Sequence, residues 1–283
     1  GIDGVLDAAG RFGGTFERID VTGRTTTPDF RLDVGGHAMP LTTTFRARVD
    51  GTDGDTYLDD IRARLGDTPI VARGAVAGAP GAPGRTVTLD VRIDSGRLED
   101  LVRLTVRTEP PFMTAGLGVE ARLVIPPGEA DVVERLSLAG QFAVRDGHFT
   151  SETVQTRLDG LSRRGRGEPG NLGVSDVPAR FDGRFAMGDG VLRLPNLAFA
   201  VRGATVDLAG TYTLRPGTID FAGHLKLDAP ASRTVTGVKS WLLKLVDPLF
   251  RRDGAGTVLP IRVEGTVDEP KFGVDVMKAL TRR

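Results

Sequence analysis

Residues 206–227, VDLAGTYTLRPGTIDFAGHLKL, hold two copies of one pattern with a turn signal between them. In each copy every second residue is apolar or glycine: Val206, Leu208, Gly210, Tyr212 and Leu214, and then Ile219, Phe221, Gly223, Leu225 and Leu227. Successive side chains of a β-strand point to opposite faces, so the alternation places this series on one face and residues such as Asp207 and Asp220 on the other. Arg215-Pro216-Gly217 is a typical turn sequence. The stretch predicts an antiparallel hairpin with one apolar and one polar face.

The same pattern recurs along the chain at uneven intervals. Further copies with a central glycine lie at Ile70–Val76, Leu136–Val144, Phe181–Met187 and Ile261–Val267, and similar runs without it lie at Val87–Ile93 and Val119–Ile125. Gly183 and Gly210 are 27 residues apart, whereas Gly210 and Gly223 are 13 residues apart. Uneven spacing favours an antiparallel meander of unequal hairpins over a solenoid of fixed period. The glycine falls on the apolar face, where a missing side chain permits close approach or a bend of the sheet.

We therefore expect a mainly all-β fold, a long curved antiparallel β-meander, with residues 1–283 as a single domain. Asp146-Gly147, Gly188-Asp189-Gly190 and Arg202-Gly203 are the turn signals between successive strands. The same alternation would also suit a sandwich of two sheets that cover each other. The pattern does not distinguish an open sheet from a sheet whose apolar face is covered by a second layer of protein.

Composition and charge exclude several classes of protein. The chain of 283 residues has no cysteine, which excludes disulfides and cysteine-bearing zinc sites. Its 37 Lys and Arg balance 37 Asp and Glu, which argues against a nucleic-acid-binding field. Its 38 glycines and 17 prolines indicate many turns. No apolar run is long enough to cross a bilayer. We interpret the chain as a piece of a longer protein, which leaves any targeting or anchoring element outside the given sequence.

A few segments have helical rather than strand periodicity. Two short helices are expected at 150–161 and around 98–102, and a longer amphipathic helix at 234–250. The apolar stripe of the longer helix comprises Val238, Trp241, Leu242, Leu245, Val246, Leu249 and Phe250. Left in water, this stripe would form a large exposed apolar patch, so we expect the helix to pack on the apolar face of the sheet or to close its end. A membrane interface or a partner protein are the alternatives.

Residues 162–171 contain almost no apolar side chain and are predicted to form a mobile loop within the domain. Its segment 163–166, Arg-Arg-Gly-Arg, is expected to be solvated, with contact to anionic lipid headgroups as the functional alternative. Residues 165–170 have the letters of a dinucleotide-binding fingerprint, but they follow no buried strand and open no helix. Phosphate binding through a dinucleotide fingerprint is therefore rejected.

The sequence shows no catalytic signature. His37, His148 and His224 are far apart and are expected to face solvent, with His148 in a hairpin turn. Five acidic residues lie close together in sequence: Asp50, Asp53, Asp55, Asp59 and Asp60. Such a cluster could indicate a calcium site, but the spacing does not match the known calcium-binding loop. Turns between strands explain these residues better. Three serines have no nucleophile-elbow context, Ser151, Ser162 and Ser175. We expect no enzyme, no metal site and no cofactor.

Several residue combinations resemble the C-terminal region of AsmA-like proteins. They are Pro126–Val133, Leu138–Phe142, Gly147–Thr150, Leu161–Gly165, Thr236–Ser240, Leu243-Lys244, Asp247–Phe250, Leu259–Ile261, Gly265-Thr266 and Pro270–Asp275. The resemblance implies a Gram-negative envelope protein in the periplasm, held to the inner membrane by an N-terminal helix that is absent from this chain. It also implies that the long antiparallel β-meander bends into an open groove. The wider AsmA, TamB and YhdP group is regarded as bridge-like lipid transfer proteins that carry phospholipid towards the outer membrane.

The resulting hypothesis is a lipid-binding or lipid-transfer module whose groove shields phospholipid acyl chains. The groove floor would be lined by Leu136, Leu138, Phe142, Phe181, Phe185, Val206, Leu208, Phe221 and Leu225. Expected partners are phospholipid acyl chains, with further contacts to a membrane surface or to envelope proteins, and no nucleic acid. The main alternative is a structural scaffold without lipid. A glycan-binding domain is a third option, for which one Trp and two Tyr offer few exposed aromatic rings.

Overall fold

The computed structural model describes residues 2–32, 36–79, 81, 83–105, 109–173, 175–214, 216–229, 257–266 and 270–274. The first strands are β1 (Ile2–Asp3), β2 (Asp7–Thr15), β3 (Arg18–Leu32), β4 (Met39–Val49), β5 (Thr56–Leu65), β6 (Thr68–Gly78), β7 (Arg85–Arg97) and β8 (Met113–Ile125). The later strands are β9 (Ser137–Phe149), β10 (Ala179–Gly188), β11 (Val191–Val201), β12 (Ala204–Thr213), β13 (Thr218–Leu227), β14 (Thr257–Thr266) and β15 (Pro270–Val274).

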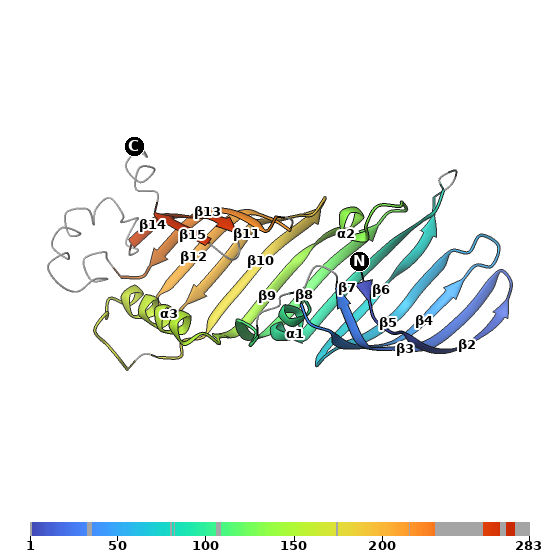
Figure 1. Cartoon of the computed structure of the whole chain (residues 1–283), viewed down its shortest axis with the longest axis horizontal. Coiled ribbons are helices and arrows are strands. Elements are labelled where there is room, and N and C mark those ends of the chain that lie inside the picture. The colour runs from blue at the N-terminus through green and yellow to red at the C-terminus, as the bar shows by residue number, and fades with distance from the viewer. Residues whose placement is uncertain are drawn as a thin grey trace. The chain divides into compact units, whose positions relative to one another are not determined.

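The fold class predicted from the sequence is confirmed. The described strands form one sheet in which β3 to β15 follow one another in chain order, and β1 and β2 both pair with β3 (Figure 1). The strand pairs with a defined register are antiparallel, from β2–β3 to β7–β8 and from β11–β12 to β14–β15. The predicted hairpin of residues 206–227 is β12–β13, paired from Ala204 with Leu227 to Thr213 with Thr218.

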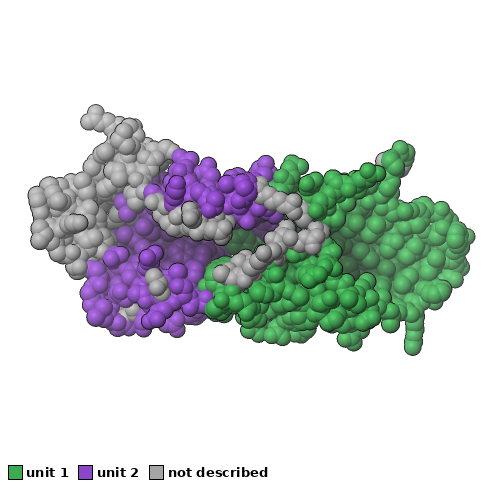
Figure 2. All heavy atoms as spheres, viewed as in Figure 1, with its two compact units in different colours: residues 1–143, 186–190 green, residues 144–185, 191–283 purple. Residues whose placement is uncertain are grey.

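The chain divides into two compact units, shown in different colours in Figure 2. Unit 1 comprises residues 1–143 and 186–190, and unit 2 comprises residues 144–185 and 191–283. In the space-filling view the face of unit 2 is hollowed between two raised rims (Figure 2). The expectation of a single domain stays a prediction.

In unit 1 the strand register carries one apolar row across seven strands. Each member lies opposite the next on the neighbouring strand, in the order Phe12, Val21, Ala47, Leu58, Gly74, Leu89 and Leu123. Residues directly opposite in an antiparallel pair share a face, so the row lies on one side of the sheet. The register therefore produces a continuous apolar surface, which extends over β2 to β5 although no strands were predicted there from the sequence.

Three helices interrupt the strands: α1 (Leu98–Thr105), α2 (Val132–Arg135) and α3 (Glu152–Gly165). The helices expected around 98–102 and at 150–161 are confirmed as α1 and α3, although both continue further along the chain. The helix expected at 234–250 lies outside the described residues. None of the helices in the described part of the chain is long and apolar enough to cross a membrane.

The mobile loop predicted at residues 162–171 is wrong in its first part, because α3 continues to Gly165. The Ser162 side chain is fully buried and donates a hydrogen bond of 2.7 Å to the carbonyl oxygen of Arg202. Gly165 is buried as well, against Gly203 in the turn between β11 and β12. Tertiary contacts with this turn therefore extend the helix beyond its local apolar pattern.

The turn predicted at Asp146-Gly147 is also wrong, because β9 runs without a break from Ser137 to Phe149. Asp146 adopts a positive φ of 53° within the strand, a conformation that aspartate tolerates better than most residues. His148 consequently lies in a strand and not in a hairpin turn, half-buried, with its Nδ1 3.0 Å from the Asp146 carbonyl oxygen.

Fully buried apolar side chains gather mainly where α1 and α3 meet the ends of strands. In unit 1 one cluster comprises Met39, Leu65 and Leu104, and Leu101 of α1 packs against it. In unit 2 the other cluster comprises Leu158, Val177, Ala179, Val201, Ala204 and Leu227. The principal contacts of the described strands are otherwise with their neighbours in the sheet and with α1 and α3. The dense core thus lies at the strand ends and leaves the middle of the apolar face uncovered by described residues.

Candidate functional site

The candidate site includes the apolar face of unit 2. Its register aligns Leu197, Leu208, Gly223, Ile261 and Val274 in one row across β11 to β15. A second row on the same face contains Phe199, Val206, Leu225 and Leu259. The rings of Phe181 and Phe199 pack with centroids 4.8 Å apart. Together these rows form a broad apolar surface.

All nine predicted floor residues belong to the apolar series and all are half-buried. Leu136, Leu138 and Phe142 lie in unit 1, and the other six lie in unit 2, namely Phe181, Phe185, Val206, Leu208, Phe221 and Leu225. In β13, half-buried and exposed residues alternate up to the buried Leu227. A core covered by a second layer would instead bury every second residue completely. The pattern describes a face that is sheltered by its own neighbours and still reaches solvent.

The recurring glycines on this face accommodate the neighbouring strand. A Cβ atom added to Gly210 would lie 2.7 Å from the Cα of Phe221 and 2.6 Å from its Cδ1, closer than side-chain carbons approach. Gly223 is similarly crowded, with the Cα of Leu208 2.9 Å from the position of an added Cβ. Such crowding arises where a sheet coils towards one face and its strands converge there. The glycines therefore permit the curvature that hollows the apolar face.

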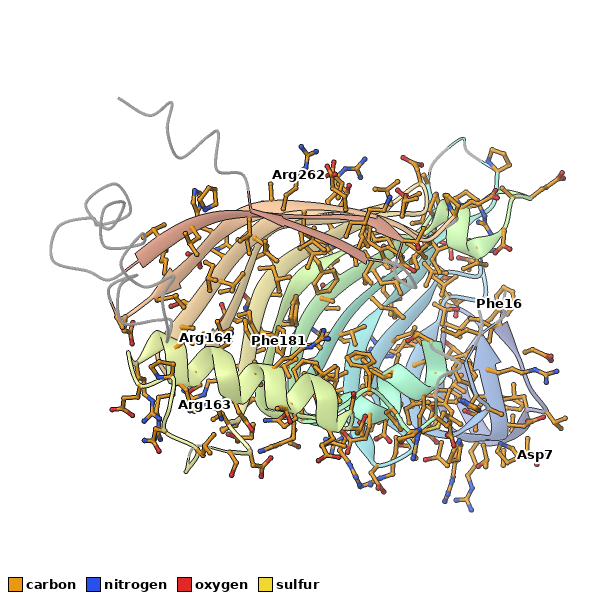
Figure 3. All side chains as sticks on the ribbon, turned by 60° about the vertical axis from the view of Figure 1, so that its left-hand side comes forward. Asp7, Phe16, Arg163, Arg164, Phe181 and Arg262 are labelled. Atoms are coloured by element: carbon orange, nitrogen blue, oxygen red, sulfur yellow. The ribbon has the colours of Figure 1, made fainter. Side chains whose placement is uncertain are left out.

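In unit 2, α3 forms one border of this face (Figure 3). Ser151 caps the helix, its side chain accepting from the backbone N–H of Val154. Leu158 enters the buried cluster, and Leu161 and Phe181 pack against that cluster from the side. The helix therefore places its apolar stripe against the strand ends and borders the open apolar surface.

Buried polar groups fix α3 to the neighbouring strands. The Asp159 carboxylate is 6% exposed and accepts hydrogen bonds from the backbone N–H groups of Asp176 and Val177, at 3.1 and 3.0 Å. The Gln155 side chain accepts from the N–H of Phe149 and donates to the carbonyl oxygen of Val177, both at 3.1 Å. These contacts join the helix to the end of β9 and the start of β10. They were missed in the sequence, where a buried carboxylate has no local signature.

In unit 1, α1 has the equivalent role at the ends of its strands. Asp100 is 4% exposed, and its Oδ2 accepts a hydrogen bond of 2.8 Å from the hydroxyl of the fully buried Thr68. Glu99 is 8% exposed and bonds Arg97 at 2.8 Å. Burial favours the neutral acid at Glu99, but hydrogen bonds from its own N–H, from Arg97 and from the N–H of Ala115 prevail and lower its pKa. Glu99 and Asp100, at the N-terminal end of α1, therefore fix this helix to the neighbouring strands.

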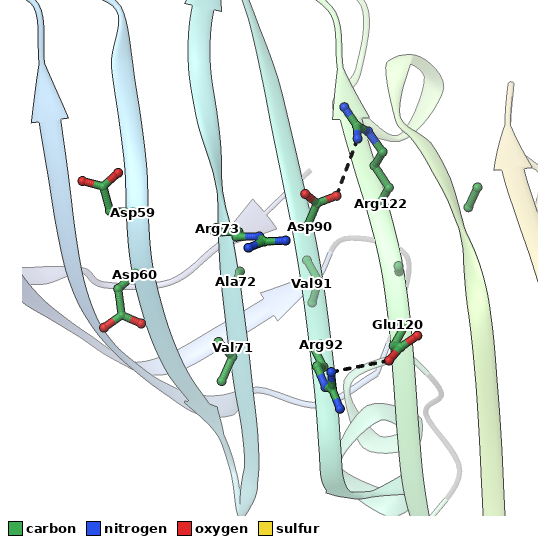
Figure 4. A pocket seen from close by; sticks show the side chains of 12 residues that line it. Asp59, Asp60, Val71, Ala72, Arg73, Asp90, Val91, Arg92, Glu120 and Arg122 are labelled. Carbon is green, nitrogen blue, oxygen red and sulfur yellow. Dashed lines mark ion pairs between the residues drawn. The ribbon is translucent and has the colours of Figure 1, made fainter.

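The opposite face of the sheet is polar and dominated by ion pairs. In unit 1, charged side chains line a depression of about 550 Å³ (Figure 4). Arg122 pairs with Asp90 at 3.8 Å, and Arg92 pairs with Glu120 at 3.7 Å. These side chains are about half or more exposed, so each pair adds little to stability. Opposite charges alternate along this surface, which is typical of a solvated sheet face.

The residues considered for metal binding have other partners. Asp50 accepts hydrogen bonds from the hydroxyl and the N–H of Thr52, and these bonds lower its pKa. The turn interpretation is wrong for Asp59 and Asp60, because both lie within strand β5. They pair with arginines instead, Asp59 with Arg48 and Asp60 with Arg46. Within the described residues no group of three or more His, Asp or Glu side chains is placed to hold a metal ion.

The three histidines occupy separate places. His37 has its Nε2 3.9 Å from Glu109, and His148 has its Nε2 3.7 Å from Asp176. His224 is exposed on the polar face of β13, opposite Asp207, as predicted. The structure does not bring the histidines together into one site.

Comparisons with known proteins identify no relative: no protein-family model, no curated protein and no solved structure matches the chain.

Proposed function

We propose that the chain is a non-catalytic lipid-binding or lipid-transfer module, in which the glycine-bearing apolar face shelters phospholipid acyl chains. The resemblance to AsmA-like proteins, and the periplasmic location with an inner-membrane anchor that it implies, belong to this proposal. So do outer-membrane biogenesis as the process served and a membrane surface or envelope proteins as further contacts.

The incomplete burial of the predicted floor residues carries the proposal. Leu208, Phe221 and Leu225 point from the middle of their strands onto one face, and each retains part of its surface in solvent. Large exposed apolar surfaces mark interaction sites in soluble proteins, because leaving them in water is unfavourable. A long apolar ligand that binds along the strands without any covalent reaction fits this surface.

The chemistry of a phospholipid matches both sides of the structure. Burying apolar surface is worth about 25 cal/mol per Å², or about 0.8 kcal/mol for each methylene group. A groove can therefore bind an acyl chain strongly without specific polar contacts. The polar face, with pairs such as Lys226–Asp207 and Arg262–Asp220, stays hydrated and keeps the module in water.

The direct test is extraction of lipid from the purified chain, followed by uptake of a phospholipid that carries a fluorophore on one acyl chain. We expect co-purified phospholipid or saturable uptake. Protein that is free of lipid and also fails to take up the fluorescent lipid would contradict the proposal.

A second test separates the lipid groove from a closed scaffold. Leu208→Asp places a charge on the middle of the apolar face. In an open groove the charge stays hydrated, so we expect uptake to fall while the protein remains folded. Unfolding of the L208D variant, measured by circular dichroism, would instead favour the scaffold with a protein-filled interior. Ala209→Asp is the matched control, since Ala209 is exposed on the polar face of the same strand.

A further inference from the structure

The helix α3 of unit 2 carries two arginines along the side that borders the apolar face. We propose that Arg157 and Arg164 bind the phosphate of an anionic phospholipid whose acyl chains lie on the adjacent apolar surface. This inference rests on the proposed function and adds a headgroup preference to it.

The helical geometry places both arginines on one side. Arg157 and Arg164 are seven residues apart, which is about two turns or about 10.5 Å along an α-helix. Leu161 lies between them on the same side, four residues after Arg157 and three before Arg164, and packs against the buried cluster of unit 2. The two guanidinium groups therefore flank a leucine that belongs to the apolar surface.

Asp159 lies on the other side of α3 from Leu161. It is buried there and binds the backbone of Asp176 and Val177, in the segment that leads into β10. In Figure 3, Arg164 is labelled above the helix beside Phe181, and Arg163 below it. Acyl chains on the strands would therefore bring their headgroup to Arg157 and Arg164.

The charges around this side of the helix favour an anion. Arg157 and Arg164 are both exposed, and neither forms an ion pair with any acidic side chain of the described residues. The nearest acid on the helix, Asp159, is buried and its two oxygens already accept backbone hydrogen bonds. A guanidinium group binds phosphate oxygens with paired N–H donors. Apolar surface and phosphate donors thus meet at one border, which is the arrangement that a phospholipid requires.

The test compares two fluorescent lipids with identical acyl chains, phosphatidylglycerol and phosphatidylcholine, bound to the full chain and to Arg157→Gln/Arg164→Gln. We expect the double variant to bind phosphatidylglycerol about threefold to tenfold more weakly, with little change for phosphatidylcholine. Raising the salt from about 0.1 M to about 1 M should weaken phosphatidylglycerol binding to the unchanged protein in the same direction. Glycerol phosphate without acyl chains should not displace the lipid at equal concentration.

The matched control is Arg180→Gln/Arg193→Gln, which removes two exposed arginines from the polar faces of β10 and β11. This control should bind both lipids as the unchanged protein does. Equal loss in the control, equal binding of both lipids by all three proteins, or displacement by glycerol phosphate would overturn the inference while leaving the proposed function intact. Failure of the unchanged protein to bind either lipid would instead contradict the proposed function, and this inference with it.

Discussion

The glycines on the apolar face provide the sharpest test of the fold. Gly210 lies opposite Leu194 on one side and opposite Phe221 on the other, in the middle of three hydrogen-bonded strands. We consider Gly210→Ala, which adds one methyl group at a point where the backbone of β13 leaves no room for a Cβ atom. An ordinary strand position would accept alanine with a small gain, because glycine loses more conformational entropy on folding.

The structure gives the size of the effect. The added Cβ would lie nearest to the carbonyl oxygen of Asp220 and 2.7 Å from the Cα of Phe221. Ordinary contact begins at 3.4 Å, so the strands must separate there by at least roughly 0.7 Å. Such a shift stretches a hydrogen bond of about 2.9 Å to about 3.6 Å, beyond useful range. Losing two to four ladder bonds at about 1 kcal/mol each lowers the free energy of unfolding by about 2–4 kcal/mol.

Thermal and urea unfolding of the full chain would measure this loss. A destabilisation of about 2–4 kcal/mol corresponds to a fall in Tm of roughly 4–16 °C for a chain of this size. Gly188→Ala is the control, since Gly188 ends strand β10 and has no heavy atom within 4 Å of an added Cβ. If G210A and G188A unfold at the same temperature as the unchanged protein, the sheet is not coiled as the structure describes, and the explanation of the glycines is wrong.

Two further predictions concern the borders of the sheet. Because the folded pKa of Glu99 is lowered, its carboxylate stabilises the fold above its ordinary pKa of about 4.3, and this contribution is lost as the pH falls through the folded pKa. Glu99→Gln should thus unfold with a free energy about 1–2 kcal/mol lower at pH 7, and the difference should shrink towards pH 3 in thermal scans; a gap independent of pH would contradict this reasoning. Ser162→Ala leaves the Arg202 carbonyl without its buried donor and should lower the free energy of unfolding in urea by about 1–3 kcal/mol, whereas Ser137→Ala, at an exposed position in β9, should change it little.

The sequence was sufficient to predict eight of the strands, namely β6 to β10 and β12 to β14, because their signal is local. Strands β1 to β5, β11 and β15 were not identified from the alternation. Period-two alternation and a turn sequence at residues 215–217 define the β12–β13 hairpin, and its observed register places Val206 opposite Leu225 as the alternation requires. The class of fold and the membership of the apolar face follow from the same rule.

The errors arose where contacts distant in sequence decide the structure. The end of α3 depends on the bond from Ser162 to Arg202, 40 residues later, so the polar run after Leu161 wrongly predicted a loop. Asp146 looked like a turn residue because aspartate favours positive φ, yet the neighbouring strands keep β9 continuous around it. The anchors Asp100 and Asp159 have no local signal, since their burial depends on which backbone groups the fold brings to them.

The buried clusters lie at the ends of the strands and not in the middle of the sheet, and this explains how an apolar face can remain open. Stability comes from the hydrogen-bonded ladder and from the clusters under α1 and α3, where Leu104 and Leu158 are buried. The middle of the face is half-buried by its own neighbours, so filling it with a second protein layer is not needed for folding. Leu208 and Phe221 can then serve ligand binding, because the stability of the fold does not depend on packing their side chains in a core. On this reasoning, polar substitutions in the middle of the apolar face should abolish uptake of lipid while the protein stays folded. Substitutions in the clusters under α1 and α3 should unfold the protein.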